Sequence, residues 1–405
     1  MNMLKVKDIN KINIDDYDVV VVGSGFAGSV IAEQLANVFD KKILVVEKRT
    51  HVGGNMYDKY DKYGFLIQQY GPHIFFTNDI GVLKYVSKFD KLVSHNCYML
   101  SYVDKKYIQL PYNFKSIQQL IGYESSDIII NKIRKEYGCS GRISVFSLIE
   151  NKDIDISKFG LMLFKKVYEP YICKQWGLLP DQISKDVIDR CKFSPNYVDR
   201  YLDVDYLYLP YHGFTFLIEN MLTNPKIDVV VGTDANQFIS FKNGKSFFKD
   251  CRKPIVYTGS LDELFGYKYG KLPYRSLKFL KRYQEKRKIL PSDIVSMPQH
   301  KTIIRETEYK YFSPFICHQE DNISVTIKEI PYEYDFSVNS IRCYPVINDV
   351  NVKKYEKYYR ESQKLQGLFL CGRLAEYKYY NMDKVIIHAI DMARIVNKTI
   401  ITEDF

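Results

Sequence analysis

Three glycines and one glutamate have the types and spacing of a dinucleotide-binding site. Gly23, Gly25 and Gly28 form the motif GSGFAG. In such a motif the first glycine permits a tight turn, the second lets the backbone approach a pyrophosphate, and the third lets a helix pack closely on a strand. Glu47 stands where a carboxylate can accept hydrogen bonds from ribose hydroxyls. Alone, the glycine motif could equally be a structural turn. Whether it binds a dinucleotide depends on the strands and the helix around it.

The elements around these residues form the expected context. Residues 17–23 (YDVVVVG) are a β-branched run, which is typical of a strand buried on both faces of a parallel sheet. From Phe26 to Val38 apolar residues recur at helical spacing, and residues 41–48 (KKILVVEK) form a second buried strand that ends in an acid. The helix N-terminus would supply unpaired amides to phosphates. The sequence therefore predicts a complete βαβ unit that binds a dinucleotide.

The segment EKRTHVGGN favours FAD over NAD. It places a second glycine pair, Gly53 and Gly54, shortly after Glu47 and close to Arg49. FAD proteins of the glutathione-reductase and amine-oxidase type use such a pair to pass their chain along the cofactor. The alternative is an ordinary turn before Asn55.

Composition excludes several other classes. The chain has 405 residues and a formal charge of +10, but its lysines are dispersed and no basic run is interleaved with aromatics, so no nucleic-acid partner is expected. Its 8 cysteines show no CxxC pair and no zinc-ligand spacing, so no metal is expected. The N-terminus lacks an apolar signal region, and no uninterrupted apolar stretch is long enough to span a membrane. We expect a cytoplasmic protein without membrane insertion.

The expected fold class is α/β, with a Rossmann-like FAD-binding βαβ domain, a helical insertion and an antiparallel sheet domain. Residues 115–190 are rich in helix-compatible segments, short alternating stretches occupy 263–361, and the C-terminus reads as a strand, a turn and a long amphipathic helix. We expect the FAD domain to comprise 15–85, 212–262 and 362–402. The insertion would comprise 110–182, with a mobile lid around 172–190, and the sheet domain 86–109, 183–211 and 263–361.

Seven short motifs in order give the chain a specific resemblance. GSGFAG, EKRTHVGGN, YGPHIFFTN, LPYN, KQWG, YRSLKF and GRLAEYKYY extend from about Tyr17 to Ile395. In this order they resemble the prokaryotic UDP-galactopyranose mutases. The resemblance implies a redox-neutral reaction on a nucleotide sugar, carried out by reduced FAD and serving surface polysaccharide synthesis. In that reaction flavin N5 attacks the anomeric carbon and expels the diphosphate, and the ring opens and recloses through a different hydroxyl. A homodimer is compatible with the resemblance.

The resemblance also implies roles for individual residues. Expected cofactor contacts are Gly23, Gly25, Phe26, Gly28, Glu47, Lys48, Arg49, Gly54, Asn55, His73, Arg373, Asn381 and Met382. Expected substrate contacts are Asn96, Tyr171, Trp176, Arg190, Tyr201, Arg275, His300, Tyr344 and Tyr379. Expected catalytic residues are Arg190, Arg275, Tyr201, Tyr379 and His73. Arg190 matches a lid arginine and Arg275 an arginine that contacts the diphosphate. Each also has a plainer interpretation, because arginines often pair with carboxylates and most of 35 tyrosines serve packing.

Several positions depart from the family pattern. Phe76 replaces a second histidine beside the flavin, Asn381 replaces an aspartate, and His300 stands where a tyrosine is usual. Ile172 replaces a threonine, and Leu207 with Tyr208 stands where a glutamine is usual. Lost hydroxyls and charges would change which ligand groups can be satisfied, so the sugar could differ from galactose. Neutral drift is the alternative for these positions.

Three classes of function are therefore weighed. The first is the mutase, acting on UDP-galactopyranose or on another sugar nucleotide that carries a deoxy-sugar, an N-acetyl sugar or a heptose. The second is an FAD-dependent oxidoreductase of amine-oxidase type, which shares the opening motif but consumes oxygen. The third is an FAD-containing binding protein without catalysis, against which the retained Arg190, Arg275, Tyr201 and Tyr379 argue.

Overall fold

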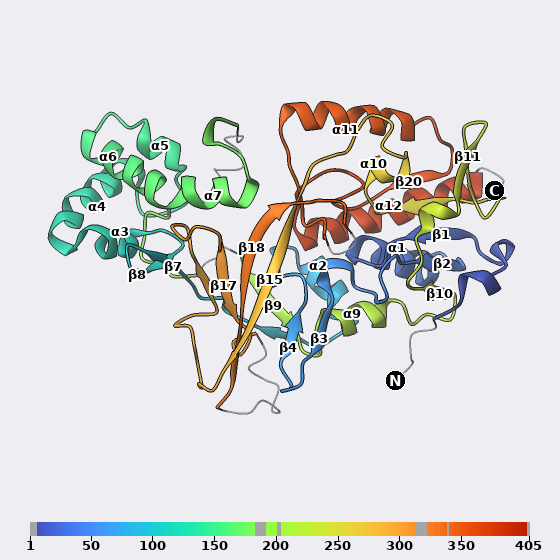
Figure 1. The fold of residues 1–405 in the computed structure, drawn as a ribbon, viewed down its shortest axis with the longest axis horizontal. Coiled ribbons are helices and arrows are strands. Elements are labelled where there is room, and N and C mark those ends of the chain that lie inside the picture. The colour runs from blue at the N-terminus through green and yellow to red at the C-terminus, as the bar shows by residue number, and fades with distance from the viewer. Residues whose placement is uncertain (1–5, 183–191, 201–203, 313–321, 338–339, 403–405) are drawn as a thin grey trace.

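A five-stranded parallel sheet forms the centre of one half of the molecule (Figure 1). The computed structural model describes residues 6–182, 192–200, 204–312, 322–337 and 340–402. The strands follow the order β10 (Ile227–Val230), β2 (Ile43–Val46), β1 (Val19–Val22), β14 (Ile255–Tyr257) and β20 (Leu368–Leu370). The β-branched residues of β1 and β2 are almost entirely buried, as expected where helices cover a parallel sheet.

Two helices far apart in the sequence pack together beside this sheet. They are α1 (Phe26–Asn37) and α12 (Met382–Thr402). The C-terminal strand and helix thus return to the N-terminal βαβ unit, and the nucleotide-binding half is discontinuous in sequence (Figure 1). The predicted α/β fold class is confirmed.

A seven-stranded sheet, antiparallel except at one strand pair, forms the second layer. Its order is β19 (Tyr344–Pro345), β15 (Tyr274–Gln284), β18 (Ser324–Glu333), β17 (Arg305–Glu308), β16 (Ile294–Ser296), β7 (Met99–Val103) and β8 (Lys106–Leu110). The parallel pair is β16 with β7, in which Ile294 lies opposite Met99. The long strands β15 and β18 rise through the middle of the molecule toward the parallel sheet (Figure 1).

Helices between β8 and β9 form a separate lobe at the left of Figure 1. They are α3 (Phe114–Ile121), α4 (Tyr123–Tyr137), α5 (Val145–Ile149), α6 (Ile154–Leu163), η4 (Phe164–Tyr168), α7 (Glu169–Trp176) and η5 (Pro180–Gln182). A capping box starts α3, because the Asn113 side chain accepts from the Ser116 N–H and the Ser116 side chain accepts from the Asn113 N–H. The helix α7 ends at Gly177, whose φ of +66° suits a glycine.

Small sheets and helices connect these units. The sheets are β3 (Asp58–Tyr60) with β4 (Leu66–Gln68), β5 (Phe75–Thr77) with β9 (Tyr206–Pro210) and β6 (Leu92–Ser94), and β11 (Ile239–Lys242) with β12 (Lys245–Phe248) and β13 (Cys251–Arg252). The remaining helices are η1 (Ile9–Lys11), η2 (Ile14–Asp16), α2 (Ile80–Val86), η3 (Gly54–Met56), α9 (Phe214–Met221), η6 (Ala235–Gln237), α10 (Leu261–Leu264) and α11 (Asp349–Ser362).

Two of these connections cross the expected domain boundaries. The strand β5, from the expected FAD domain, pairs with β9 from the expected sheet domain. All but the last residue of α11 falls in the range 263–361, yet this helix packs against α10, at the top of Figure 1. The boundaries themselves stay a prediction.

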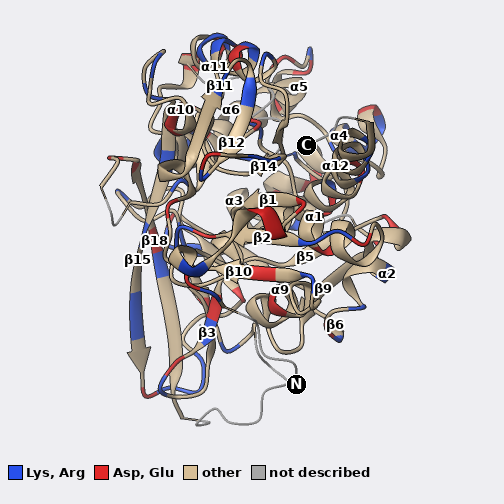
Figure 2. Ribbon diagram, turned by 90° about the vertical axis from the view of Figure 1, so that its right-hand side faces the viewer, with Lys and Arg blue, Asp and Glu red and all other residues tan. Residues whose placement is uncertain are grey.

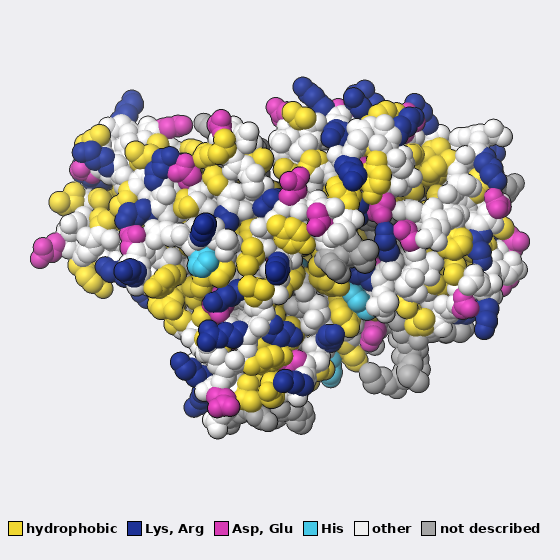
Figure 3. All heavy atoms as spheres, viewed as in Figure 1, with side chains coloured by type: hydrophobic (Ala, Val, Ile, Leu, Met, Phe, Trp, Pro, Cys, Tyr) yellow, Lys and Arg dark blue, Asp and Glu magenta, His cyan; other side chains and the backbone are white. Residues whose placement is uncertain are grey.

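Charges are mixed over the visible surfaces. Figure 2 shows basic and acidic residues interspersed along the elements, and Figure 3 shows lysine and arginine side chains spread over one face with acidic side chains between them. Among the described residues, no helix is both long and apolar enough to cross a membrane, including the 21-residue α12.

Candidate active site

The glycine motif forms a turn between β1 and α1 that leaves room for a ligand. Gly23 has a φ of +96°, and Gly25 is the N-cap of α1. A Cβ added to Gly28 would lie 1.9 Å from the carbonyl oxygen of Gly23, whereas one added to Gly25 would meet nothing closer than 3.9 Å. Gly28 therefore serves close packing of helix on strand, and Gly25 keeps the backbone open to an incoming group.

Glu47 holds this turn from the end of β2. Its Oε2 accepts from the Ser24 N–H (2.8 Å) and from the Ser24 hydroxyl (2.7 Å), and its Oε1 accepts from the Arg49 N–H (2.9 Å). Each carboxylate oxygen has two lone pairs. The carboxylate thus positions the turn and keeps acceptor capacity for ribose hydroxyls.

The second glycine pair packs directly on the first motif. The Gly53 N–H donates to the carbonyl oxygen of Ser24 (3.0 Å), and a Cβ on Gly54 would approach the Gly25 Cα to 3.0 Å. The neighbouring Arg49 donates from Nη2 to Asn55 Oδ1 (2.8 Å), and its guanidinium carbon lies 4.4 Å from the centre of the Tyr70 ring. The two glycine motifs therefore form one continuous backbone surface.

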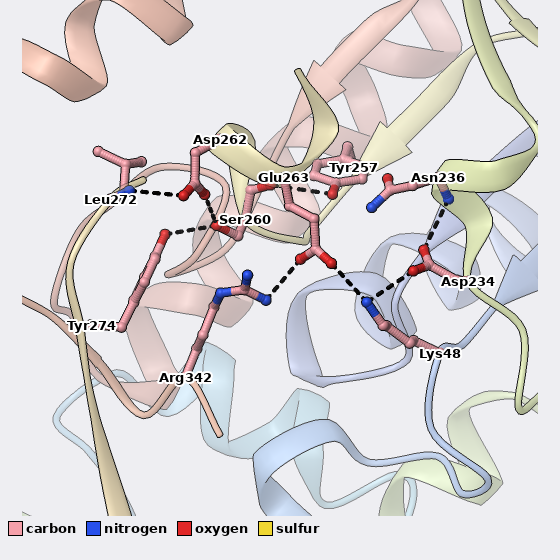
Figure 4. A network of polar contacts seen from close by, with 10 residues as sticks. All are labelled: Lys48, Asp234, Asn236, Tyr257, Ser260, Asp262, Glu263, Leu272, Tyr274 and Arg342. Carbon is pink, nitrogen blue, oxygen red and sulfur yellow. Dashed lines mark hydrogen bonds and ion pairs between the residues drawn. The ribbon is translucent and has the colours of Figure 1, made fainter. Parts of the chain in front are cut away.

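An ion-pair network connects Lys48, Asp234, Glu263 and Arg342 (Figure 4). Glu263 lies between two cations, with Oε1 2.7 Å from Lys48 Nζ and Oε2 2.7 Å from Arg342 Nη1. Lys48 also pairs with Asp234 at 2.8 Å. Lys48, expected as a cofactor contact, thus lines the cavity while already paired with two carboxylates. The network joins the parallel sheet to the segment that follows β18.

All of these groups line one large cavity of about 1550 Å³. Twelve of the thirteen expected cofactor contacts lie in its wall: Gly23, Gly25, Phe26, Glu47, Lys48, Arg49, Gly54, Asn55, His73, Arg373, Asn381 and Met382. The thirteenth is Gly28, which lies behind the turn. Among the expected substrate contacts, Tyr344 and Tyr379 line the cavity. Arg190 and Tyr201 lie outside the described residues, so their roles stay a prediction.

His73 is held as a neutral imidazole in this wall. Its Nδ1 lies 2.8 Å from the carbonyl oxygen of Gly71, which can only accept, so Nδ1 carries the proton and Nε2 is the acceptor. The Gln68 side chain bonds both the N–H and the C=O of His73. Burial, followed by the nearby charges of Arg373 and Arg305, lowers the pKa of His73 to about 3.

Arg305 is a functional candidate that the sequence analysis missed. It stands at the start of β17, lines the cavity and donates from Nε to Glu329 Oε1 at 2.7 Å. The Glu329 carboxylate is fully buried, and its charge raises the pKa of Arg305 against the opposing effect of burial. Two fixed cations, Arg305 and Arg373, therefore act electrostatically on His73. The available signal was the segment TIIRETE, in which an arginine opens an alternating strand three residues after Thr302.

Three aromatic side chains meet where the helical lobe touches the cavity. The ring centres of Trp176 and Tyr344 are 6.3 Å apart, those of Trp176 and Tyr379 6.4 Å, and those of Tyr344 and Tyr379 5.6 Å. The Arg373 guanidinium carbon lies 4.8 Å from the centre of the Tyr379 ring. Trp176 is not itself in the cavity wall, but it backs two tyrosines that are. Burial raises the pKa of Tyr344, so this phenol keeps its proton.

Arg275 binds protein rather than the cavity. Its Nε donates to the carbonyl oxygen of Gln175 (2.9 Å) and its Nη2 to that of Lys174 (3.3 Å), both at the C-terminal end of α7. A cation at this end also suits the helix dipole. Lys174 in turn donates from Nζ to the carbonyl oxygens of Met297 (2.7 Å) and His300 (2.5 Å). Both side chains thus fix the helix that carries Trp176.

The other expected substrate contacts lie away from the cavity wall. Asn96 is exposed, and the His300 side chain is exposed and accepts from the Thr302 and Ile303 N–H groups through Nδ1. Tyr171 packs, as Tyr344 does, on the small cluster around Leu277. Their assignments remain predictions. Of the departures from the family pattern, Phe76 and Asn381 face the cavity and Ile172 and Leu207 are buried in the core.

The fold and the cavity define the class of the dinucleotide-binding proteins. The residues fit such a cofactor, because Gly25 leaves open space and Arg49 Nη1 is buried without a hydrogen-bond partner among the described residues, so it would suit a phosphate or carbonyl acceptor. Comparison with known families makes the class more specific. Residues 166–379 match the UDP-galactopyranose mutase family, and residues 21–89 match the NAD(P)-binding Rossmann-like domain.

Individual relatives extend this match over nearly the whole chain. The UDP-galactopyranose mutase of Mycoplasma genitalium is 35% identical, covering 95% of each chain. The dTDP-fucopyranose mutase of Escherichia coli is 30% identical, covering 94% of this chain and 98% of the relative. The crystal structure of reduced UDP-galactopyranose mutase superposes with a TM-score of 0.69 at 15% identity, covering 94% of this chain and 93% of the other.

The chain belongs to the UDP-galactopyranose mutase family. It is a mutase, an enzyme of the isomerase class, and family membership implies a flavin cofactor.

Proposed function

We propose that this protein interconverts the pyranose and furanose forms of a nucleotide sugar, with FAD in its reduced state. One observation carries the proposal: the dinucleotide turn, His73 and two fixed arginines all open into one cavity. The FAD would be held by the turn at Gly25, by Glu47, and by Arg49 with its hydrogen-bonded partner Asn55. When bound and reduced it supplies the nucleophile N5, and a covalent N5–sugar adduct is part of the proposal.

The cations of the cavity fit the needs of the departing diphosphate. Negative charge develops on the diphosphate as its bond to the sugar breaks. Cations that are already held in position stabilise this charge without any cost of reorganisation. Arg305 is held by Glu329, and Arg373 donates from Nε to the carbonyl oxygen of Tyr380 at 2.6 Å. Arg190, Arg275 and Tyr201 remain proposed diphosphate contacts on the resemblance alone.

Neutral hydrogen-bonding groups fit the sugar. His73 Nε2 offers an acceptor and the Tyr344 phenol offers a donor, and both side chains line the cavity. Trp176 packs against both tyrosines in tilted and edge-on contacts. These groups can orient hydroxyls of an opened sugar without adding charge. The proposal includes a cytoplasmic location, a homodimer and a role in surface polysaccharide synthesis, all carried over from the resemblance.

A direct experiment separates the mutase from an oxidase. Protein with bound flavin is incubated anaerobically with dithionite and UDP-galactopyranose, and the products are separated by chromatography. We expect a furanose isomer with reduced flavin, none with oxidised flavin, and no substrate-dependent oxygen consumption in air. Equal turnover with oxidised flavin, or stoichiometric oxygen uptake, would contradict the proposed function.

A second candidate is the same chemistry on a sugar with fewer hydroxyls. Phe76 faces the cavity where the family pattern has a histidine, and a phenyl ring cannot satisfy a hydroxyl that the imidazole would bind. A relative of equal coverage is a dTDP-fucopyranose mutase. Competition between UDP-galactopyranose and dTDP-fucopyranose under the same anaerobic conditions tests this, and a kcat/KM that favours the galactose substrate would exclude it.

A further inference from the structure

A histidine, a cysteine and an aspartate lie close together beside the cavity, whose wall includes the cysteine, Cys97. His95 Nε2, Cys97 Sγ and a carboxylate oxygen of Asp293 all lie within 4.8 Å of one another. All three side chains are buried, with exposed fractions of 8%, 3% and 2%. Nothing in the proposed mutase reaction uses them.

The fold brings these residues together through one strand pair. The segment with His95 and Cys97 leads into β7, and Asp293 immediately precedes β16, which runs parallel to β7. Backbone bonds hold both segments: the His95 N–H donates to the carbonyl oxygen of Leu207 (3.0 Å), and the Glu308 N–H donates to that of Asp293 (2.9 Å). The three ligand atoms are therefore presented by rigid backbone.

The contact between His95 and Asp293 is close but does not have the geometry of a hydrogen bond. His95 Nε2 and Asp293 Oδ2 are 2.9 Å apart, yet neither atom makes a hydrogen bond to any described residue. Both atoms are buried, and buried polar atoms are normally satisfied. Both atoms therefore keep lone pairs that a bound cation could use.

A second His–Cys–carboxylate group in the described chain shows the contrast. It consists of Cys371, Glu376 and His388. There, Glu376 Oε2 already accepts from the Gly372 N–H (2.9 Å), from the Tyr380 hydroxyl and from His388 Nδ1 (3.0 Å). This carboxylate is satisfied by protein, whereas Asp293 Oδ2 is not. Of the two groups, only the one formed by His95, Cys97 and Asp293 therefore keeps a buried carboxylate oxygen without a hydrogen bond to the described residues.

We propose that His95, Cys97 and Asp293 bind a zinc ion. Imidazole, thiolate and carboxylate are the ligands that Zn²⁺ takes, at distances of about 2.0 to 2.3 Å, which puts ligand atoms of a tetrahedral site roughly 3 to 4 Å apart. Neutral imidazole, thiolate and carboxylate together cancel the charge of Zn²⁺, so the bound ion adds no net charge to a buried place.

The ion would tie the two sheets of the cavity together. Cys97 and Ile294, next to Asp293, both line the cavity, so a fourth coordination position would face it and take a water molecule. The His95 backbone is bonded to β9 of the three-stranded sheet, and Asp293 immediately precedes β16 of the seven-stranded sheet. Bound zinc therefore stabilises the folded chain by linkage.

The test uses untagged, full-length protein with its flavin. The protein is treated with a chelator, freed of it, and equilibrated by dialysis against zinc chloride, after which metal content is measured by mass spectrometry and melting temperature by circular dichroism. We expect about one zinc ion per chain and a higher melting temperature. Cobalt chloride in place of zinc should give the thiolate charge-transfer absorption of a sulfur-ligated ion.

Variants locate the ion. Cys97→Ser should abolish the cobalt charge-transfer band. Asp293→Asn should weaken zinc binding by at least about tenfold, because even the loss of a residue that only supports a metal ligand lowers metal affinity by about that factor. Cys371→Ser is the matched control and should bind zinc as the wild type does. Each variant is checked for flavin content and circular dichroism. The proposal is overturned if the wild-type protein binds no zinc and shows no cobalt band. It is also overturned if Cys371→Ser loses the ion while the Cys97 and Asp293 variants keep it.

Discussion

Gly28 packs on Gly23 so closely that a Cβ on Gly28 would lie 1.9 Å from the Gly23 carbonyl oxygen, while a Cβ on Gly25 would meet nothing closer than the Gly54 Cα at 3.9 Å. The two glycines of the same motif therefore have separable roles, one in packing and one in ligand access. They allow a test in which stability and flavin binding are read independently.

Gly25→Ala should leave the melting temperature of the flavin-free protein nearly unchanged and weaken FAD binding at least tenfold, because its methyl group occupies the place where the backbone approaches a pyrophosphate. Gly28→Ala should instead destabilise the fold by about 1–3 kcal/mol or more, since the helix must move off the strand. Urea unfolding and flavin absorbance after gel filtration measure the two effects. Equal loss of stability in both variants would contradict this division.

Arg305→Ala should weaken binding of free UDP by more than about tenfold, the cost of removing a charge-assisted contact of roughly 1.5–3 kcal/mol. The reason is that Arg305 faces the cavity with its orientation fixed by Glu329. Isothermal titration of UDP into the anaerobic protein checks it, and Arg282→Ala, on an outlying part of β15, is a control that should bind normally. Unchanged affinity in Arg305→Ala would remove Arg305 from the site.

Arg275→Ala distinguishes the role implied by the resemblance from the role suggested by the geometry. A diphosphate contact predicts weaker UDP binding with an unchanged free protein. If Arg275 instead holds the C-terminal end of α7 in place, the environment of Trp176 should change in the free protein as well, because the hydrogen bonds to Gln175 and Lys174 are lost. Trp176 is the only tryptophan, so its fluorescence reports on this directly. We expect shifted emission without ligand, and an unshifted spectrum with weakened UDP binding would support the diphosphate role instead.

Stability should fall in acid partly through His73. Its folded-state pKa of about 3 lies below the unfolded value near 6.5, so the unfolded chain takes up the proton first and the stabilisation present above about pH 6.5 is lost as the pH falls toward 3. Between pH 7 and pH 5 the loss from this residue is up to about 2 kcal/mol. Urea unfolding of wild type and His73→Gln at both pH values measures it. A variant that loses as much stability as wild type would show that other groups dominate.

Phe76→His combined with Asn381→Asp should change sugar preference while leaving affinity for the free nucleoside diphosphate nearly unchanged. Both residues face the cavity, and both restore a group that can bond a ligand hydroxyl or a cofactor atom. The ratio of kcat/KM for UDP-galactopyranose and dTDP-fucopyranose measures the preference, and titration of UDP is the control. If wild type already prefers UDP-galactopyranose and the ratio does not move, the departures are neutral.

The dinucleotide half follows from the sequence alone, because its signals are local. The run at residues 17–23, the glycine turn and Glu47 lie within about thirty residues. Each glycine of the turn is needed where a side chain would not fit, for the tight turn, for ligand access or for close packing of the helix. Glu47 was expected to contact a ribose, and the structure adds that it also holds the Ser24 backbone. The long amphipathic C-terminal helix was equally readable, since its apolar face repeats at helical spacing.

The opposite wall of the cavity depended on the tertiary structure. Arg275 and Arg305 are both arginines on strands of the seven-stranded sheet, and no local pattern says which faces the cavity; strand pairing and the buried Glu329 decide it. Likewise, His95 and Asp293 are separated by nearly 200 residues and meet only because β7 and β16 run side by side. Contacts between strands distant in sequence depend on register and sheet order, and these are set by packing of the whole chain rather than by any segment of it.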